Sequence, residues 1–295
     1  MLMNLLSYLQ LIPMLVSEGG IGAALEGFDF VGVIFGFLNQ LTFLVDAFIA
    51  AAFFAAIIRS IFKSFWKVVW RGIIFIILVI ILFSFVGMFA PTLGQLPVSI
   101  KGTAGGTAVE WTNLAQVING VSIKAGYSDS YALALTEVVL KNLTIWFGIM
   151  AIGIITPIIS GITFPLFNLL LPKKVKDLKL IPARFAISIG LTLIAVMIFA
   201  IPMATLVPPM TAFKAAITED TLMYKFLNPE VIGFLELFTT ERSILLKIVN
   251  LGNVAGSLNM FSAFKDGATT INLSDALPEL FQQLNTIPFV EAASA

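Results

Sequence analysis

The chain has 295 residues, of which 59% are hydrophobic and 12% are charged. Soluble domains carry about 25% charged residues, so this composition indicates a protein that is surrounded largely by lipid. The sequence contains no cysteine and no histidine, which excludes disulfide bonds, thiolate nucleophiles, Cys/His zinc sites and catalytic histidines. We therefore expect an all-α integral membrane protein that has no metal or cofactor site.

The first 29 residues carry acidic side chains and no basic ones. Within them, the apolar run Leu2–Val16 is shorter than the roughly 20 residues that a membrane-crossing helix needs. We interpret this run as a helix at the membrane interface, and a fifth span is the alternative.

Four longer apolar stretches meet the length requirement: about Phe30–Ile58, Gly72–Ala90, about Leu143–Leu171, and Phe185 to about Val207. They predict four transmembrane helices in two hairpins. The chain is thereby divided into an N-terminal segment (1–29), a first hairpin (30–91), an extracytoplasmic loop region (92–142), a second hairpin (143–208) and an extracytoplasmic helical tail (209–295).

The charges predict how these hairpins are oriented. Residues 59–71 and residues 172–184 each carry a net charge of +4, whereas residues 209–295 contain nine acidic and five basic side chains. Because basic loops remain in the cytoplasm, we expect both hairpin turns to be cytoplasmic and both termini to be extracytoplasmic. The two charge-marked hairpins and the lack of cysteine favour a bacterial cytoplasmic (inner) membrane.

The first basic segment is also a candidate binding site. Arg59, Lys63, Lys67 and Arg71 recur every fourth residue, so on one helix they would form a single stripe opposite an aromatic and aliphatic face. A helix of this kind lies flat among lipid head groups. It is a candidate contact for anionic lipids or a partner, and a topology anchor without a binding role is the alternative.

Asp46 is the only formal charge within the four apolar stretches, and Asn39 and Gln40 lie about two turns before it. An ionised carboxylate at the centre of a bilayer costs about 2.5–3.5 kcal/mol on insertion scales. Three interpretations remain open. Asp46 binds a cation or proton, it forms a hydrogen bond between helices, or it lies near the membrane surface because the first stretch is two pieces.

The third stretch contains Pro157 and Pro165, each of which removes a backbone donor. Thr156, Ser160 and Thr163 are expected to bond to the carbonyl groups that are freed. A discontinuous helix with a binding site and a simple kink are both open, and the lack of nearby charges favours the kink.

The segments outside the spans predict small elements. We expect strands or loops in residues 92–142, where Val-Ser-Ile-Lys occurs twice (Val98–Lys101 and Val121–Lys124), and then a helix at about Asp129–Lys141. The tail predicts three short helices: Pro229–Phe238, Thr240–Asn250 and Ser274–Leu284. Since such pieces are too short for a core of their own, we expect them on the membrane surface or against a partner.

These observations favour a non-catalytic scaffold or accessory subunit of a larger membrane assembly for secretion, envelope maintenance or energy conversion. The acidic residues are scattered, which does not favour an enzyme. The expected partners are anionic lipids and other membrane subunits or copies of the same chain, and nucleic acid is not expected. The alternative is an oligomeric channel or transporter that uses Asp46 as its intramembrane cation or proton site.

Overall fold

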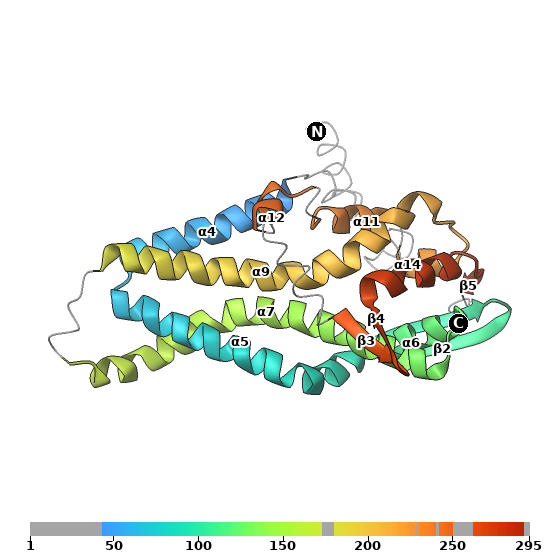
Figure 1. Cartoon of the computed structure of the whole chain (residues 1–295), viewed down its shortest axis with the longest axis horizontal. Coiled ribbons are helices and arrows are strands. Elements are labelled where there is room, and N and C mark those ends of the chain that lie inside the picture. Colours follow the sequence, from blue (N-terminus) through green and yellow to red (C-terminus); the bar gives the residue numbers. More distant parts are fainter. Residues whose placement is uncertain (1–42, 173–179, 228, 240–241, 250–261, 292–295) are drawn as a thin grey trace, which may run out of the picture.

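The computed structural model describes residues 43–172, 180–227, 229–239, 242–249 and 262–291. Four helices in this part are long and apolar enough to cross a membrane: α4 (Leu44–Phe62), α5 (Phe65–Gly94), α7 (Asp129–Leu170) and α9 (Ile181–Phe213). They run along the long axis of the molecule (Figure 1). The predicted number of candidate spans is therefore confirmed. The predicted helix at 2–16, Asn39, Gln40 and most of the second basic segment lie outside the described residues.

Helix α7 is the longest element of the structure. Its 42 residues extend roughly 60 Å at about 1.5 Å per residue, twice the thickness of a hydrocarbon core. Ser128 caps its start by accepting a hydrogen bond from the backbone N–H of Tyr131. The helix continues through Pro157 and Pro165, so the interpretation of a discontinuous helix is wrong.

The long helices pack around α9, which contacts α4, α5 and α7. Helix α5 lies along α7, and Gly148 allows a close approach because a Cβ at this position would collide with the side chain of Leu82. Phe75, Ile145 and Ile198 belong to the apolar core between these helices. Large apolar side chains on the outer faces remain exposed, as expected for surfaces that contact lipid: Phe54, Ile80, Ile154 and Ile162.

A small sheet lies at one end of the bundle, so the expectation of an all-α protein is wrong in this respect. Its antiparallel strands, in the order β2-β1-β5, are β1 (Pro97–Ala104), β2 (Thr107–Asn113) and β5 (Phe289–Glu291). The turn between β1 and β2 contains Gly105 and Gly106 at φ 57° and 79°, a backbone region that favours glycine. Strands or loops were expected in residues 92–142, and the two strands and the helix that begins near Asp129 agree with this, whereas residues 114–124 form a helix that was not expected.

Short helices and a second hairpin complete the described structure, some of them against this sheet and others against the long helices. They are α6 (Leu114–Lys124), a 3₁₀ turn (Lys214–Ala216), α10 (Leu222–Phe226), α11 (Pro229–Glu236), α12 (Ile244–Val249), β3 (Ala263–Asp266), β4 (Thr269–Asn272) and α14 (Leu273–Leu284). Three predicted tail helices thus correspond to α11, α12 and α14. Helix α14 begins one residue before the predicted start at Ser274, with Asn272 at its N-cap. We name β1, β2, β5, α6, α10, β3, β4, α14 and the first turns of α7 the cap.

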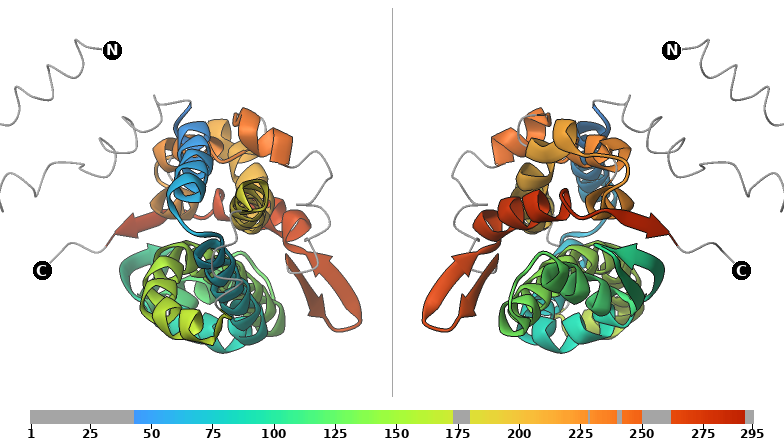
Figure 2. Two further views of the ribbon diagram at one scale, coloured as in Figure 1. Left: turned by 90° about the vertical axis from the view of Figure 1, so that its left-hand side faces the viewer. Right: turned by 90° about the vertical axis from the view of Figure 1, so that its right-hand side faces the viewer.

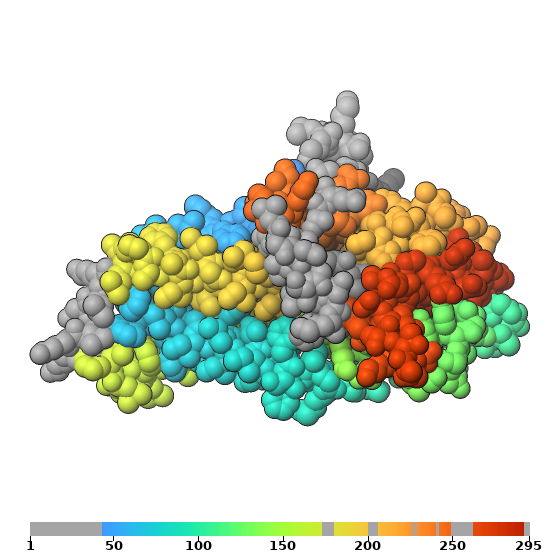
Figure 3. Space-filling model, in the orientation of Figure 1, coloured from blue at the N-terminus to red at the C-terminus, as the bar shows by residue number. Residues whose placement is uncertain are grey.

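The cap has a core of its own, which corrects the expectation that its short pieces need a partner surface. Leu277, Leu280, Phe281 and Leu284 on one face of α14 are buried, together with Leu135 of α7. Helix α14 lies between α9 on one side and α6 and α7 on the other, as the end view in Figure 2 shows. Figure 3 shows the same elements in close contact at the surface. Each amphipathic piece therefore buries its apolar face against the others.

Candidate functional site

The first basic segment is divided between two helices. Helix α4 ends at Phe62 and α5 begins at Phe65, while Lys63 and Ser64 between them have extended backbone conformations. The expectation of a single helix carrying all four bases is therefore wrong. The turn instead places Arg59 on α4, Lys63 in the connection, and Lys67 and Arg71 on α5.

The start of α9 lies against this turn. Nη1 of Arg184 donates a hydrogen bond to the backbone oxygen of Lys63 at 2.5 Å, and the Oγ of Ser60 lies 3.4 Å from the backbone oxygen of Arg184. The end of α7 reaches the same place, because Nε1 of Trp70 donates to Oγ1 of Thr163 at 2.8 Å. We name this region, at the opposite end of the bundle from the cap (Figure 1), the basic end.

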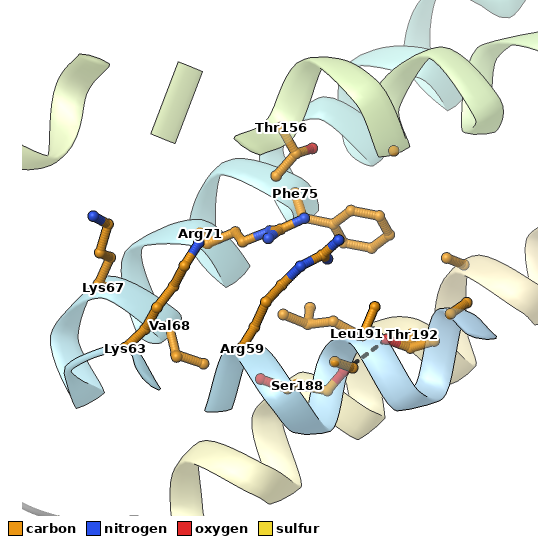
Figure 4. A pocket seen from close by; sticks show the side chains of 15 residues that line it. Arg59, Lys63, Lys67, Val68, Arg71, Phe75, Thr156, Ser188, Leu191 and Thr192 are labelled. Atoms are coloured by element: carbon orange, nitrogen blue, oxygen red, sulfur yellow. Dashed lines mark hydrogen bonds between the residues drawn. The ribbon is translucent and has the colours of Figure 1, made fainter. Parts of the chain in front are cut away.

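A cavity of about 230 Å³ opens at the basic end between α4, α5, α7 and α9. Its polar lining consists of the four bases of the turn and three hydroxyl residues: Arg59, Lys63, Lys67, Arg71, Thr156, Ser188 and Thr192. In Figure 4 the side chains of Arg59 and Arg71 extend side by side toward the ring of Phe75. Lys67 instead places its ammonium group 5.7 Å from the centre of the Phe164 ring. The two arginines are thus the bases that converge most directly.

The described lining residues contain no acidic side chain to balance these charges. The ion pairs found in the described part of the chain all involve other bases. Burial lowers the pKa of Lys63 below its usual 10.5, and the positive charges of Arg71, Lys67 and Arg59 lower it further. Both causes disfavour the charged lysine, so a bound anion would relieve the repulsion between the bases.

Thr156 of α7 is the buried hydroxyl residue of this cavity, with 2% of its surface exposed. Its Oγ1 has no hydrogen-bond partner among the residues that the structure describes. Thr144 and Thr163 on the same helix each donate to the backbone oxygen four residues earlier, at 2.7 Å. A buried hydroxyl group without a partner is unfavourable, so Thr156 offers the cavity an unused donor.

A comparison of the chain with protein-family models, curated proteins and solved structures finds no match. The function must therefore be argued from the site itself. The described residues contain no group of three or more aspartate, glutamate, cysteine or histidine side chains that could hold a metal ion.

Asp46 does not line this cavity and lies far from its bases, in the first turn of α4. Thirteen residues separate it from Arg59, a distance of roughly 20 Å along a helix. Its Oδ1 accepts hydrogen bonds from Oγ of Ser243 at 2.5 Å and from the backbone N–H of Leu245 at 3.0 Å, and its Oδ2 accepts one from Ile244 at 3.2 Å. These bonds join α4 to the start of α12, the geometry expected of a hydrogen bond between helices.

The sequence thus identified the four bases but not the hydroxyl groups that face them. Ser188 and Thr192 lie four residues apart on α9, a spacing that places both on one face of a helix. That spacing was the available signal. Thr156, Ser160 and Thr163 were expected to bond to carbonyl groups freed by Pro157 and Pro165, and this expectation is wrong. Ser160 and Thr163 donate to the backbone oxygens of Pro157 and Ile159, which are not the carbonyl groups four residues before a proline, and Thr156 has no partner among the described residues.

Proposed function

We propose that the chain is a non-catalytic membrane protein that binds an anionic ligand in the cavity at the basic end. One observation carries this proposal: Arg59, Lys63 and Arg71 converge on a cavity whose described lining residues include no acid. Guanidinium groups bind phosphate and carboxylate oxygens through paired, charge-assisted hydrogen bonds. Lysine and hydroxyl groups around them can donate to the remaining oxygens.

The energetics favour a bound anion. Bases held close together in a partly buried site repel one another, and this repulsion lowers the stability of the ligand-free protein. A ligand that binds only the folded protein raises its stability by about 2.7 kcal/mol at a concentration of 100 Kd. Ligand binding should therefore be visible as a higher unfolding midpoint.

The wider role that we propose is that of an accessory subunit or scaffold in a membrane assembly. The described lining offers cations and hydroxyl groups, which suit recognition of a ligand better than bond making. The apolar tail no longer argues for a partner surface, because α14 packs within the cap, while α11 and α12 pack on the long helices. The positive-inside rule supports a cytoplasmic basic end and an extracytoplasmic cap in a bacterial inner membrane.

The alternative of an oligomeric channel that uses Asp46 has weaker support. The carboxylate of Asp46 already accepts three hydrogen bonds from the start of α12. A cation or proton site at Asp46 would have to exchange these bonds for the ligand during each cycle. We therefore place this function second.

Inorganic phosphate is a suitable first probe. The full-length protein in nanodiscs of zwitterionic lipid should show a higher unfolding midpoint in millimolar phosphate, and the double variant Arg59→Gln, Arg71→Gln should not. The matched control is Arg242→Gln with Lys247→Gln, which removes two exposed positive charges of the tail. The proposal fails if phosphate does not stabilise the native protein, or if the cavity variant and the control respond alike.

A further inference from the structure

The cavity at the basic end has two chemically different parts. Charged and hydroxyl side chains surround the part near the turn between α4 and α5, as described above. Seven residues before Arg59, roughly 10 Å farther along α4, the lining residue is Ala52. Small or apolar side chains line the part that is farther from this turn, which we name the deeper part: Ala52, Ala55, Phe75, Gly153, Leu191 and Ala195. A ligand that fills both parts must be anionic at one end and apolar at the other.

The deeper part opens on the side of the bundle. Ala52 of α4 and Gly153 of α7 both line the cavity and are both exposed. Helix α4 packs on α9, while α7 packs on α5 and α9, so α4 and α7 stand on either side of this opening. Phe48 and Met150, which lie one helical turn before these two residues on the same faces of α4 and α7, are exposed apolar side chains. The opening therefore faces the surface that contacts lipid.

The cavity is large enough for a phosphorylated head group. Its volume of about 230 Å³ is far above the roughly 10–15 Å³ that a single water molecule requires. We therefore expect it to hold a phosphate group and a glycerol unit, with acyl chains that continue outside. The opening between Ala52 and Gly153 leads to the region where such chains reside.

We infer that the ligand is a lipid phosphomonoester that enters sideways between α4 and α7. Its phosphate lies between Arg59 and Arg71, and its acyl chains leave past Ala52 and Gly153. A phosphomonoester carries a charge of about −1.5 to −2 near neutral pH, which matches the surplus of cations better than the single charge of a phosphodiester. This inference rests on the proposed function, because it names the anion that the same site binds.

The opening can be closed without touching the bases. A Cβ at Gly153 would meet no atom within 4 Å, so the double variant Ala52→Leu, Gly153→Leu adds bulk at the opening. Ala51→Leu with Gly161→Leu is the matched control, since both residues are exposed on the same two helices outside the cavity lining, and a Cβ at Gly161 also meets nothing. If the double variant does not fold, Gly153→Leu alone replaces it.

The measurement is native mass spectrometry of the full-length protein in detergent, titrated with three probes. These are dioctanoyl phosphatidic acid, dioctanoyl phosphatidylcholine and glycerol 3-phosphate. We expect phosphatidic acid to bind about tenfold or more tightly than either other probe, since it alone combines the dianionic head with acyl chains. Closing the opening should weaken the binding of phosphatidic acid by about tenfold and leave the binding of glycerol 3-phosphate unchanged. The control variant should bind both probes as tightly as the native protein does.

The outcomes separate this inference from the proposed function. If glycerol 3-phosphate binds as tightly as phosphatidic acid and the closed variant binds both normally, the ligand is a soluble phosphate. The inferred entry between α4 and α7 is then wrong, but the proposed anion site is still supported. If both lipids bind equally and Arg59→Gln with Arg71→Gln changes nothing, the cavity is a site for any acyl chain. If no probe depends on the arginines, both the inference and the proposed function fail.

Discussion

The two ends of the bundle differ in whether basic side chains are paired with acidic ones. In the cap, Lys101 is paired with Glu110 and Lys225 with Glu291, each at 2.6 Å, and the apolar faces form one core. At the basic end, the described cavity lining places arginines and lysines together without an acid. The cap is organised for stability, whereas the basic end retains an arrangement that is unfavourable until an anion binds. Unfavourable electrostatics of this kind are typical of functional sites.

The largest effect is expected from a truncation in the cap core. Leu135 of α7 is fully buried, and Leu135→Ala should lower the free energy of unfolding by about 2–5 kcal/mol because it removes apolar contacts and leaves a cavity. Leu133→Ala, on the same helix with 62% of its surface exposed, should cost less than about 0.5 kcal/mol. Denaturant unfolding in detergent measures both. Equal losses would show that the cap does not depend on this core.

Asp46 should have an intermediate effect that also tests the channel alternative. Asp46→Ala removes the acceptor of three hydrogen bonds and should cost about 1–2 kcal/mol, whereas Asp46→Asn keeps one acceptor oxygen and should cost less. Thermal unfolding measures this difference. Cation flux into liposomes provides the second readout, because loss of an existing flux in both variants would support an ion site at Asp46.

At the basic end, removing a positive charge should raise the stability of the ligand-free protein instead of lowering it. Lys63→Gln should raise the unfolding midpoint of the ligand-free protein and weaken phosphate binding. The hydrogen bond from Arg184 is retained because it reaches the backbone oxygen of Lys63. Lys247→Gln, at an exposed position of α12, is the control. A lower midpoint for Lys63→Gln would contradict the view that the bases repel one another.

The pH dependence of Lys63 follows from the same repulsion. Because the pKa of Lys63 is lowered in the folded protein, the folded state loses this proton before the unfolded state does. The contribution of Lys63 to stability should therefore increase as the pH rises from its folded pKa toward 10.5. Lys63→Gln should remove this increase when both proteins are unfolded across that range.

The smallest effect is expected at Tyr127 in the cap. Burial, followed by the charges of Glu279 and Tyr131, raises the pKa of Tyr127 to about 12, and its hydroxyl group has no partner among the described residues. The unfolded chain loses this proton near pH 10, so stability should fall between pH 10 and about 12. Tyr127→Phe should lose less stability in that range and change little at pH 7. An identical alkaline loss in Tyr127→Phe would contradict this assignment.

Hydropathy predicted the spans better than it predicted where the helices end. The second stretch was expected at Gly72–Ala90, but α5 extends over Phe65–Gly94. The third was expected from Leu143, after a helix at about Asp129–Lys141, but α7 is one continuous helix from Asp129 to Leu170. Apolar composition marks the part of a helix that lipid can surround, whereas hydrogen bonding and capping decide where the helix stops.

The repeated tetrapeptide shows why the cap was harder to predict. Val98–Lys101 lies in β1, whereas the identical Val121–Lys124 lies in α6. In β1, Ile100 is opposite Trp111 of β2. In α6, Val121 is buried in the cap core. Tertiary contacts thus decide the conformation of a sequence that has no strong preference of its own.

The candidate site was predicted as a list of bases but not as a cavity. A spacing of four residues predicts one stripe only if the helix is continuous, and the extended backbone at Lys63 and Ser64 ends it. The fold then adds Thr156 from α7 and Thr192 from α9, which come from distant parts of the sequence. Such a constellation depends on how four helices pack, and local sequence patterns do not contain that information.

Strand β5 has a consequence for how the protein is made. Phe289–Glu291 pairs with Gly102–Ala104 of β1. The central strand of the sheet can therefore form its second set of ladder hydrogen bonds only after a partner almost 190 residues later has been synthesised. Contacts that are so distant in sequence form slowly. Until the ribosome has passed this point, β1 has an unpaired edge, which is open to aggregation or to a chaperone.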